Sequence, residues 1–116
     1  MSAATQPVSP LSSLFAGSKA AKVIDFLLSK QEHEQHQTMT EIHAGTQASI
    51  NMINKIIDDL IDIDAVGIGA KRIQGLDNKG KGRDENTYYI RDDTDTGKSI
   101  RDLWYHLMQV QTKSIS

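Results

Sequence analysis

The chain has 116 residues, of which 38% are hydrophobic, a formal net charge of −2 and no cysteine. This length fits one domain, and the lack of cysteine excludes disulfides, thiolate metal sites and cysteine nucleophiles. No apolar run approaches the roughly 20 residues that span a bilayer, and the N-terminus lacks the basic start and apolar core of a signal peptide, so the sequence predicts a soluble cytoplasmic protein with no membrane partner.

The N-terminal third combines a polar segment with a helical pattern. Residues 1–13 contain both prolines and no apolar period, which predicts a disordered N-terminal tail. From Ser18 the apolar residues recur at helix spacing and then fade in the polar run 31–37, which predicts one helix. Its apolar face comprises Ala20, Val23, Ile24, Leu27 and Leu28.

Two short helices follow in close succession. The segment Thr38-Met39-Thr40-Glu41 fits a capping box, so a helix should begin there and end near Gly45. Ser49 can cap a second helix that runs to about Ile63. The residues expected to face inward are Ile42 in the first helix and Ile53, Ile56, Ile57 and Leu60 in the second.

The next region changes in both pattern and charge. Residues 67–76 and 86–93 favour β-structure, and the basic, glycine-rich stretch between them predicts a hairpin with a long tip. Residues 66–91 carry six cations against three acids, net +3, whereas residues 25–64 carry two against eight, net −6. Because the local electrostatic field decides where an anion docks, the hairpin is a candidate anion-binding surface.

A final helix is predicted from Asp95 to Val110, and residues 99–102 are predicted to cap it. The predicted order is helix, helix, helix, hairpin, helix. We therefore expect a mainly α, α+β fold: a winged helix-turn-helix domain at residues 14–92, followed by a C-terminal helical segment at 93–116.

Residues 41–60 resemble the helix-turn-helix core of prokaryotic winged-helix regulators such as the MarR and ArsR groups. Ile42 matches the inward residue of the first motif helix, Ala48 the buried turn residue and Ser49 the cap of the recognition helix. Gln47 stands where the family's turn glycine usually falls. Residues 14–28 resemble the first helix of archaeal members. The resemblance covers residues 14–91 and implies a double-stranded DNA-binding transcriptional regulator, associated with the nucleoid.

The predicted DNA contacts come from the second motif helix and the hairpin. Asparagine can bond bidentately to adenine, lysine can reach guanine or phosphate, and glycines let a basic hairpin tip approach a backbone. The alternative is that both surfaces are merely solvated. The candidate residues are Ser49, Ile50, Asn51, Asn54 and Lys55 on the helix and Lys71, Arg72, Lys79, Lys81 and Arg83 on the hairpin.

The C-terminal helix is predicted to form a homodimer. One face of this helix is more apolar than a small winged domain with a full core requires, and aromatic residues dominate interface energetics. The alternative is that this helix folds back and completes its own core. The candidate interface residues are Ile100, Leu103, Trp104 and Leu107.

Other chemistry is weakly supported. Residues 95–99, DTGKS, echo the end of a phosphate-binding loop, but Asp92 stands where that loop needs its first glycine. His33 and His36 make only an incomplete metal site. No nucleophile, base and acid are grouped, so we predict no enzyme, no cofactor and no metal. The alternative function is a winged-helix module that binds protein in a plasmid, viral or replication assembly.

Overall fold

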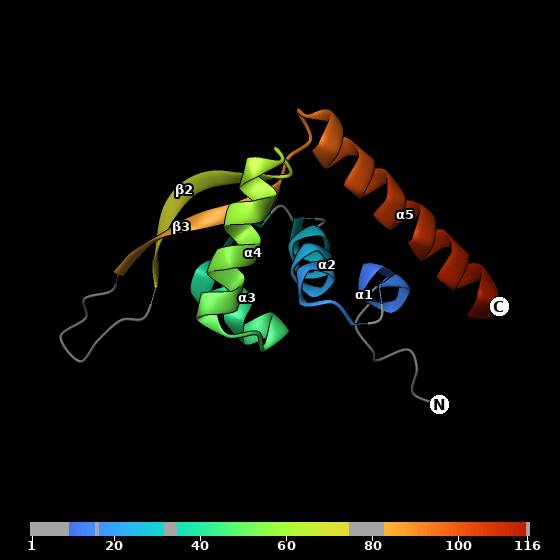
Figure 1. Cartoon of the computed structure of the whole chain (residues 1–116), viewed down its shortest axis with the longest axis horizontal. Coiled ribbons are helices and arrows are strands. Elements are labelled where there is room, and N and C mark those ends of the chain that lie inside the picture. Colours follow the sequence, from blue (N-terminus) through green and yellow to red (C-terminus); the bar gives the residue numbers. More distant parts are fainter. Residues whose placement is uncertain (1–9, 16, 32–34, 75–82, 116) are drawn as a thin grey trace.

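The computed structural model describes residues 10–15, 17–31, 35–74 and 83–115. Figure 1 shows a helical body from which a β-hairpin projects on one side and a long C-terminal helix on the other. The elements are α1 (Pro10–Leu14), α2 (Lys19–Gln31), β1 (Gln37–Thr38), α3 (Met39–Thr46), α4 (Ile50–Asp62), β2 (Val66–Gln74), β3 (Arg83–Ile90) and α5 (Asp95–Ile115). The predicted α+β winged helix with an additional C-terminal helix is confirmed.

The sheet is antiparallel and has the strand order β1-β3-β2. Val66 pairs with Ile90 at the base of the hairpin, and the β2–β3 ladder shifts register between Gly69 and Arg72. The sequence did not predict β1, because a strand of two residues carries no alternation that a pattern could reveal. The predicted hairpin is confirmed, and its tip at residues 75–82 lies outside the described residues.

The core is aliphatic apart from one indole, as the low aromatic content requires. The buried hydrophobic residues are Leu11, Ala21, Val23, Leu27, Leu28, Ile42, Ala48, Ile53, Ile57, Leu60, Ala65, Val66, Ile90 and Trp104. They come from α1, α2, α3, α4, both hairpin strands and α5, so one core joins the whole domain.

Close helix packing depends on a glycine in α3. A side-chain carbon on Gly45 would overlap with the Phe26 ring of α2. From the sequence, Gly45 was predicted only to mark the end of this helix. It also lets α3 approach α2, which sets the position of the helix-turn-helix motif on the core.

The prediction of a disordered tail at residues 1–13 is wrong for residues 10–13, which lie in α1. Pro10 suits the first turn of a helix because its missing N–H would have no intrahelical partner there. Pro10, Leu11 and Ser12 are buried. The sequence showed no apolar period because a five-residue helix is too short to have one.

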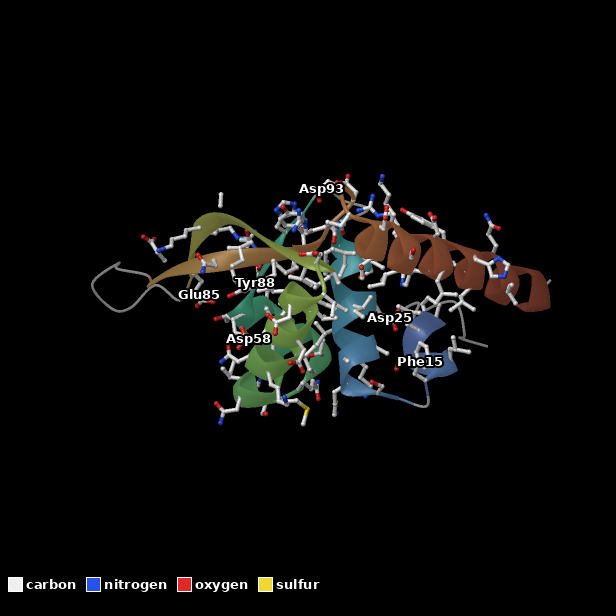
Figure 2. All side chains as sticks on the ribbon, turned by 45° about the horizontal axis from the view of Figure 1, so that its top comes forward. Phe15, Asp25, Asp58, Glu85, Tyr88 and Asp93 are labelled. Atoms are coloured by element: carbon white, nitrogen blue, oxygen red, sulfur yellow. The ribbon has the colours of Figure 1, made fainter. Side chains whose placement is uncertain are left out.

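Buried Asp25 of α2 joins three helices. Its Oδ1 accepts hydrogen bonds from Leu11 N at 3.1 Å and Trp104 Nε1 at 3.1 Å, and its Oδ2 accepts from Ser12 N at 2.8 Å. Figure 2 shows Asp25 on the side of α2 that faces α1 and α5. Burial raises the pKa of the Asp25 carboxyl, and the three hydrogen bonds oppose that rise.

The role predicted for Trp104 as a dimer anchor needs correction. Its side chain is 1% exposed within a single chain, and its indole N–H is bonded to Asp25. Trp104 therefore completes the protein's own core, the alternative considered for α5. On the same helix Leu103 is exposed, and Ile100 and Leu107 are partly buried.

Helix α5 begins at a cap that lies five residues before the predicted one. Thr94 Oγ1 accepts a hydrogen bond from Gly97 N at 3.1 Å and donates one to the Asp64 carbonyl at 2.6 Å. The DTGKS segment is thus the first turn of a helix. Among the helices that the structure describes, none combines the length and apolar character needed to cross a bilayer.

Candidate nucleic-acid interface

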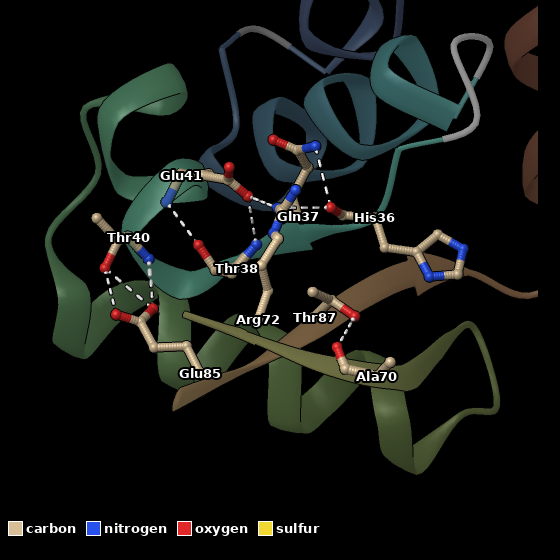
Figure 3. Close-up of polar contacts among 9 residues, drawn as sticks. All are labelled: His36, Gln37, Thr38, Thr40, Glu41, Ala70, Arg72, Glu85 and Thr87. Carbon is tan, nitrogen blue, oxygen red and sulfur yellow. Dashed lines mark hydrogen bonds and ion pairs between the residues drawn. The ribbon is translucent and has the colours of Figure 1, made fainter. Parts of the chain in front are cut away.

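The N-terminus of α3 is fixed by the predicted capping box. Thr38 Oγ1 accepts a hydrogen bond from Glu41 N at 3.2 Å, and Glu41 Oε1 accepts one from Thr38 N at 2.9 Å. Both amides would otherwise lack partners at a helix start. Figure 3 shows this box beside the hairpin, where α3 meets the sheet.

The turn between α3 and α4 has the backbone geometry that favours glycine. Gln47 has φ 61° and ψ 14°, and its N–H donates to the His43 carbonyl at 2.8 Å. This left-handed residue stands where the resemblance placed the family's turn glycine. The turn therefore keeps the expected shape, although a residue with a side chain must adopt a strained backbone conformation there.

Two side chains brace the same turn. His43 Nδ1 lies 2.6 Å from the Ala48 carbonyl oxygen, and Thr46 Oγ1 donates to the Ile42 carbonyl at 2.7 Å. Buried Ala48 closes the turn against the core, as predicted. This contact of His43 was not predicted, although a histidine five residues before a buried turn residue is close enough in sequence to have suggested it.

Helix α4 carries an inward apolar face and an exposed outward face. Ser49 caps it by accepting a hydrogen bond from Met52 N at 3.2 Å, as predicted. The predicted inward residues Ile53, Ile57 and Leu60 are buried, and Ile56 is partly buried. The outward residues are Ile50, Asn51, Met52, Asn54 and Lys55, of which the sequence analysis overlooked Met52.

The outward face of α4 divides into two halves of different charge. The first two turns, residues 50–57, contain Lys55 and no acid, whereas Asp58, Asp59 and Asp62 follow and are exposed. Lys55 Nζ lies 3.6 Å from Asp59 Oδ2 in an exposed ion pair. Figure 2 shows Asp58 directed away from the core. The N-terminal half, which carries no acid, is therefore the part of α4 suited to approach a polyanion.

Arg72, a predicted DNA contact, is held within the protein. Its Nη2 donates to the His36 carbonyl at 2.9 Å and forms an ion pair with Glu41 of the capping box (Figure 3). A phosphate contact would have to compete with these bonds. We therefore assign Arg72 to fixing β2 against the start of α3, a role that the sequence did not reveal because the partner lies 31 residues away.

A second carboxylate reaches the start of α3 from β3. Glu85 accepts hydrogen bonds from Thr40 N at 3.2 Å and from Thr40 Oγ1 at 2.7 Å (Figure 3). Negative charge is favourable at a helix N-terminus, where the backbone dipole is positive. In the sequence, Glu85 is only one of the three acids that partly offset the cations of residues 66–91.

The structure describes the other hairpin candidates to different extents. Lys71 is exposed on β2. Arg83 begins β3, and its side chain lies outside the described set. Lys79 and Lys81 lie outside the described residues, so their predicted phosphate contacts stay predictions.

A groove of about 460 Å³ separates α4 from the hairpin. Ile50 and Asn54 border it from α4, opposite Tyr88 of β3. Figure 2 shows Tyr88 on the part of β3 that faces α4. The remaining lining residues are Met39, Thr40, Asp84, Glu85 and Asn86. Helix α4 and the β2–β3 hairpin, the wing of this fold, thus flank a recess on the candidate DNA-binding side.

The histidines suggested as metal ligands lie in different settings. His33 is outside the described residues, and His36 stacks on Tyr89 with ring centroids 4.4 Å apart. In the part of the chain that the structure describes, no group of three or more His, Asp or Glu side chains could hold a metal ion.

Comparison with known proteins supports the fold. No protein-family model and no curated protein matches the chain. Among solved structures it is similar to a point mutant of MepR from S. aureus, with a TM-score of 0.54 and 10% identity, over 92% of this chain and 69% of that chain. At this identity the likeness shows the winged-helix fold alone.

Proposed function

We propose that this protein is a sequence-specific, double-stranded DNA-binding protein that regulates transcription in the cytoplasm, associated with the nucleoid. The observation that carries the proposal is the outward face of the first half of α4, which is exposed, free of acids and held by a braced turn. A helix so placed suits the major groove. The likeness to MepR, a winged-helix regulator of the MarR family, supports this assignment.

In this proposal α4 and the wing have separate tasks. Asn51 and Asn54 contact base edges, which carry sequence information, while the cap at Ser49 orients the helix. Lys71, Lys79, Lys81 and Arg83 neutralise phosphates, which adds affinity without sequence preference.

Salt dependence of duplex binding tests the division of tasks. The triple variant Lys79→Ala, Lys81→Ala, Arg83→Ala should bind cognate and random duplexes more weakly, and each lost phosphate contact should flatten the log–log salt slope by about 0.9. Lys98→Ala, an exposed cation on α5, should keep the wild-type slope. An unchanged slope in the triple variant would remove the wing from the interface.

We also propose that the protein forms a homodimer through residues 93–116. Leu103 lies at the centre of this interface, with Ile100 and Leu107 beside it. Leu103 is 39% exposed, and Leu14 and Phe15 expose further apolar surface at the end of α1, which packs beside α5 (Figure 1). A dimer would present two copies of α4, suited to an inverted repeat with half-sites about one helical turn apart.

Sedimentation at tens of micromolar tests the dimer. The wild type should sediment as a dimer and Leu103→Glu as a monomer, because a charge would be buried without a partner. Ser99→Glu, exposed on the same helix, should remain dimeric. A monomeric wild type would contradict both the dimer and the inverted repeat.

A second candidate function is a module that binds a basic protein surface. The acids Asp58, Asp59 and Asp62 on the second half of α4 favour it, because they repel phosphates. The absence of duplex binding at low salt would favour this candidate over the first.

A further inference from the structure

The first two turns of α4 expose an unusual combination of side chains. Ile50 is 40% exposed and Met52 is 44% exposed, beside the exposed amides of Asn51 and Asn54. Exposed apolar side chains on a helix-turn-helix motif do not stabilise the free protein. They contribute favourable binding free energy when a partner removes them from water.

These four side chains match the edge of one kind of base pair. In the major groove, adenine offers N7 and N6 to the bidentate amide of asparagine, and thymine offers its C5-methyl group to an apolar side chain. Guanine is instead read by Arg or Lys, and cytosine by Asp or Glu. Residues 50–57 contain no acid, and their one cation, Lys55, is paired with Asp59.

The spacing places the two kinds of contact on neighbouring base pairs. Ile50 and Asn54 are four residues apart, share one face of α4 and both border the groove against β3. Their separation along the helix is about 6 Å, four residues at about 1.5 Å each, against a rise of about 3.4 Å per base pair. Because a recognition helix can enter the major groove at an angle, residues three or four apart can contact successive bases. An apolar contact and an amide contact on the same face can therefore reach adjacent base pairs.

We propose that α4 selects consecutive A·T base pairs, with Ile50 and Met52 against thymine methyl groups and Asn51 and Asn54 on adenine. The proposal rests on the proposed DNA-binding function and names the sequence class that this surface reads.

Selection of duplexes from a random pool is the first step of the test. The bound pool should be enriched in consecutive A·T pairs at the centre of each half-site. Each thymine of the enriched site is then replaced singly by deoxyuridine, which removes only the C5-methyl group. Because this change is made in the DNA, the protein's folding is unaffected.

The wild type should lose about fourfold in affinity at each contacted thymine, the factor for one buried methyl group. Ile50→Ala and Met52→Ala should each bind more weakly and become insensitive to deoxyuridine at one position. Ile63→Ala is the matched control, because Ile63 is 52% exposed at the far end of α4, and it should keep wild-type sensitivity.

The outcomes separate this inference from the proposed function. An enriched site with G·C pairs under α4, or one whose affinity is unchanged by every deoxyuridine, overturns A·T selection and leaves DNA binding standing. A pool with no enriched duplex overturns both.

Discussion

The helix-turn-helix motif and the pole formed by α1 and α5 are held together in different ways. At the turn of the motif and the start of α4, side chains bond across three to five residues, as Ser49 does with Met52 and His43 with Ala48. At the pole, Asp25 bonds to Leu11 across 14 residues and to Trp104 across 79. The candidate reading surface is thus shaped locally, whereas at the pole a buried carboxylate joins α1 and α5 to a residue of α2 that is distant in sequence.

Substitution at Asp25 should break the pole and have the largest effect on stability. Asp25→Ala leaves three buried N–H groups without an acceptor and should lower the free energy of unfolding by about 3–5 kcal/mol. Asp25→Asn keeps one acceptor oxygen but turns an amide N–H toward another donor, so its loss should be intermediate. Urea denaturation measures both, and a loss under about 1 kcal/mol for Asp25→Ala, the size of one ordinary hydrogen bond, would show that Asp25 does not anchor the pole.

Gly97→Ala should weaken the start of α5 by about 1–3 kcal/mol. A Cβ at Gly97 would overlap with the Arg91 carbonyl, which is backbone and cannot rotate away. Ser99→Ala lies two residues on, is exposed and should change little. Thermal unfolding of the two variants gives the comparison, and equal midpoints would mean that the Arg91 contact relaxes without cost.

At the motif, Gln47→Gly should stabilise the protein by about 0.5–1 kcal/mol, because glycine adopts φ 61° without strain. Gln47→Ala keeps the strain and should stay within about 0.5 kcal/mol of the wild type. Chemical denaturation measures the three proteins side by side. A glycine variant less stable than the alanine variant would show that the turn gains more from its side chain than it loses in strain.

The smallest expected effect is a pH dependence at the pole. Burial raises the folded-state pKa of Asp25 above its unfolded value, so the folded protein binds this proton more tightly. The stability that Asp25 contributes is therefore complete below the unfolded pKa and declines as pH rises through the folded pKa. The wild type should gain stability relative to Asp25→Asn as pH falls across that window. An opposite slope in paired denaturation curves would show that the three hydrogen bonds outweigh burial.

The motif was predictable because its signals are local. The Thr38–Glu41 capping box, the Ser49 cap and the buried row containing Ile53 and Ile57 follow from spacing within a few residues. The expected exposure of Asn51 and Asn54 follows from the same helical period.

The remaining features depend on partners distant in sequence. The helix α1 is too short to show a period and is secured by Asp25. The same carboxylate accepts a hydrogen bond from Trp104, which lies in the core. No pattern within α5 distinguishes a core tryptophan from one at an interface. Likewise, the pairing of Arg72 with Glu41 required the hairpin and the capping box to be placed together.

The claim that the first half of α4 reads bases is tested most directly with the variants Asn51→Ala and Asn54→Ala. Each variant is bound to the selected duplex and to a random duplex of equal length. Fluorescence anisotropy at one fixed salt concentration gives the four affinities beside those of the wild type. Each variant should lose about 1–3 kcal/mol on the selected duplex and almost nothing on the random one. Equal losses on the two duplexes, or none on either, would contradict the assignment of base reading to α4.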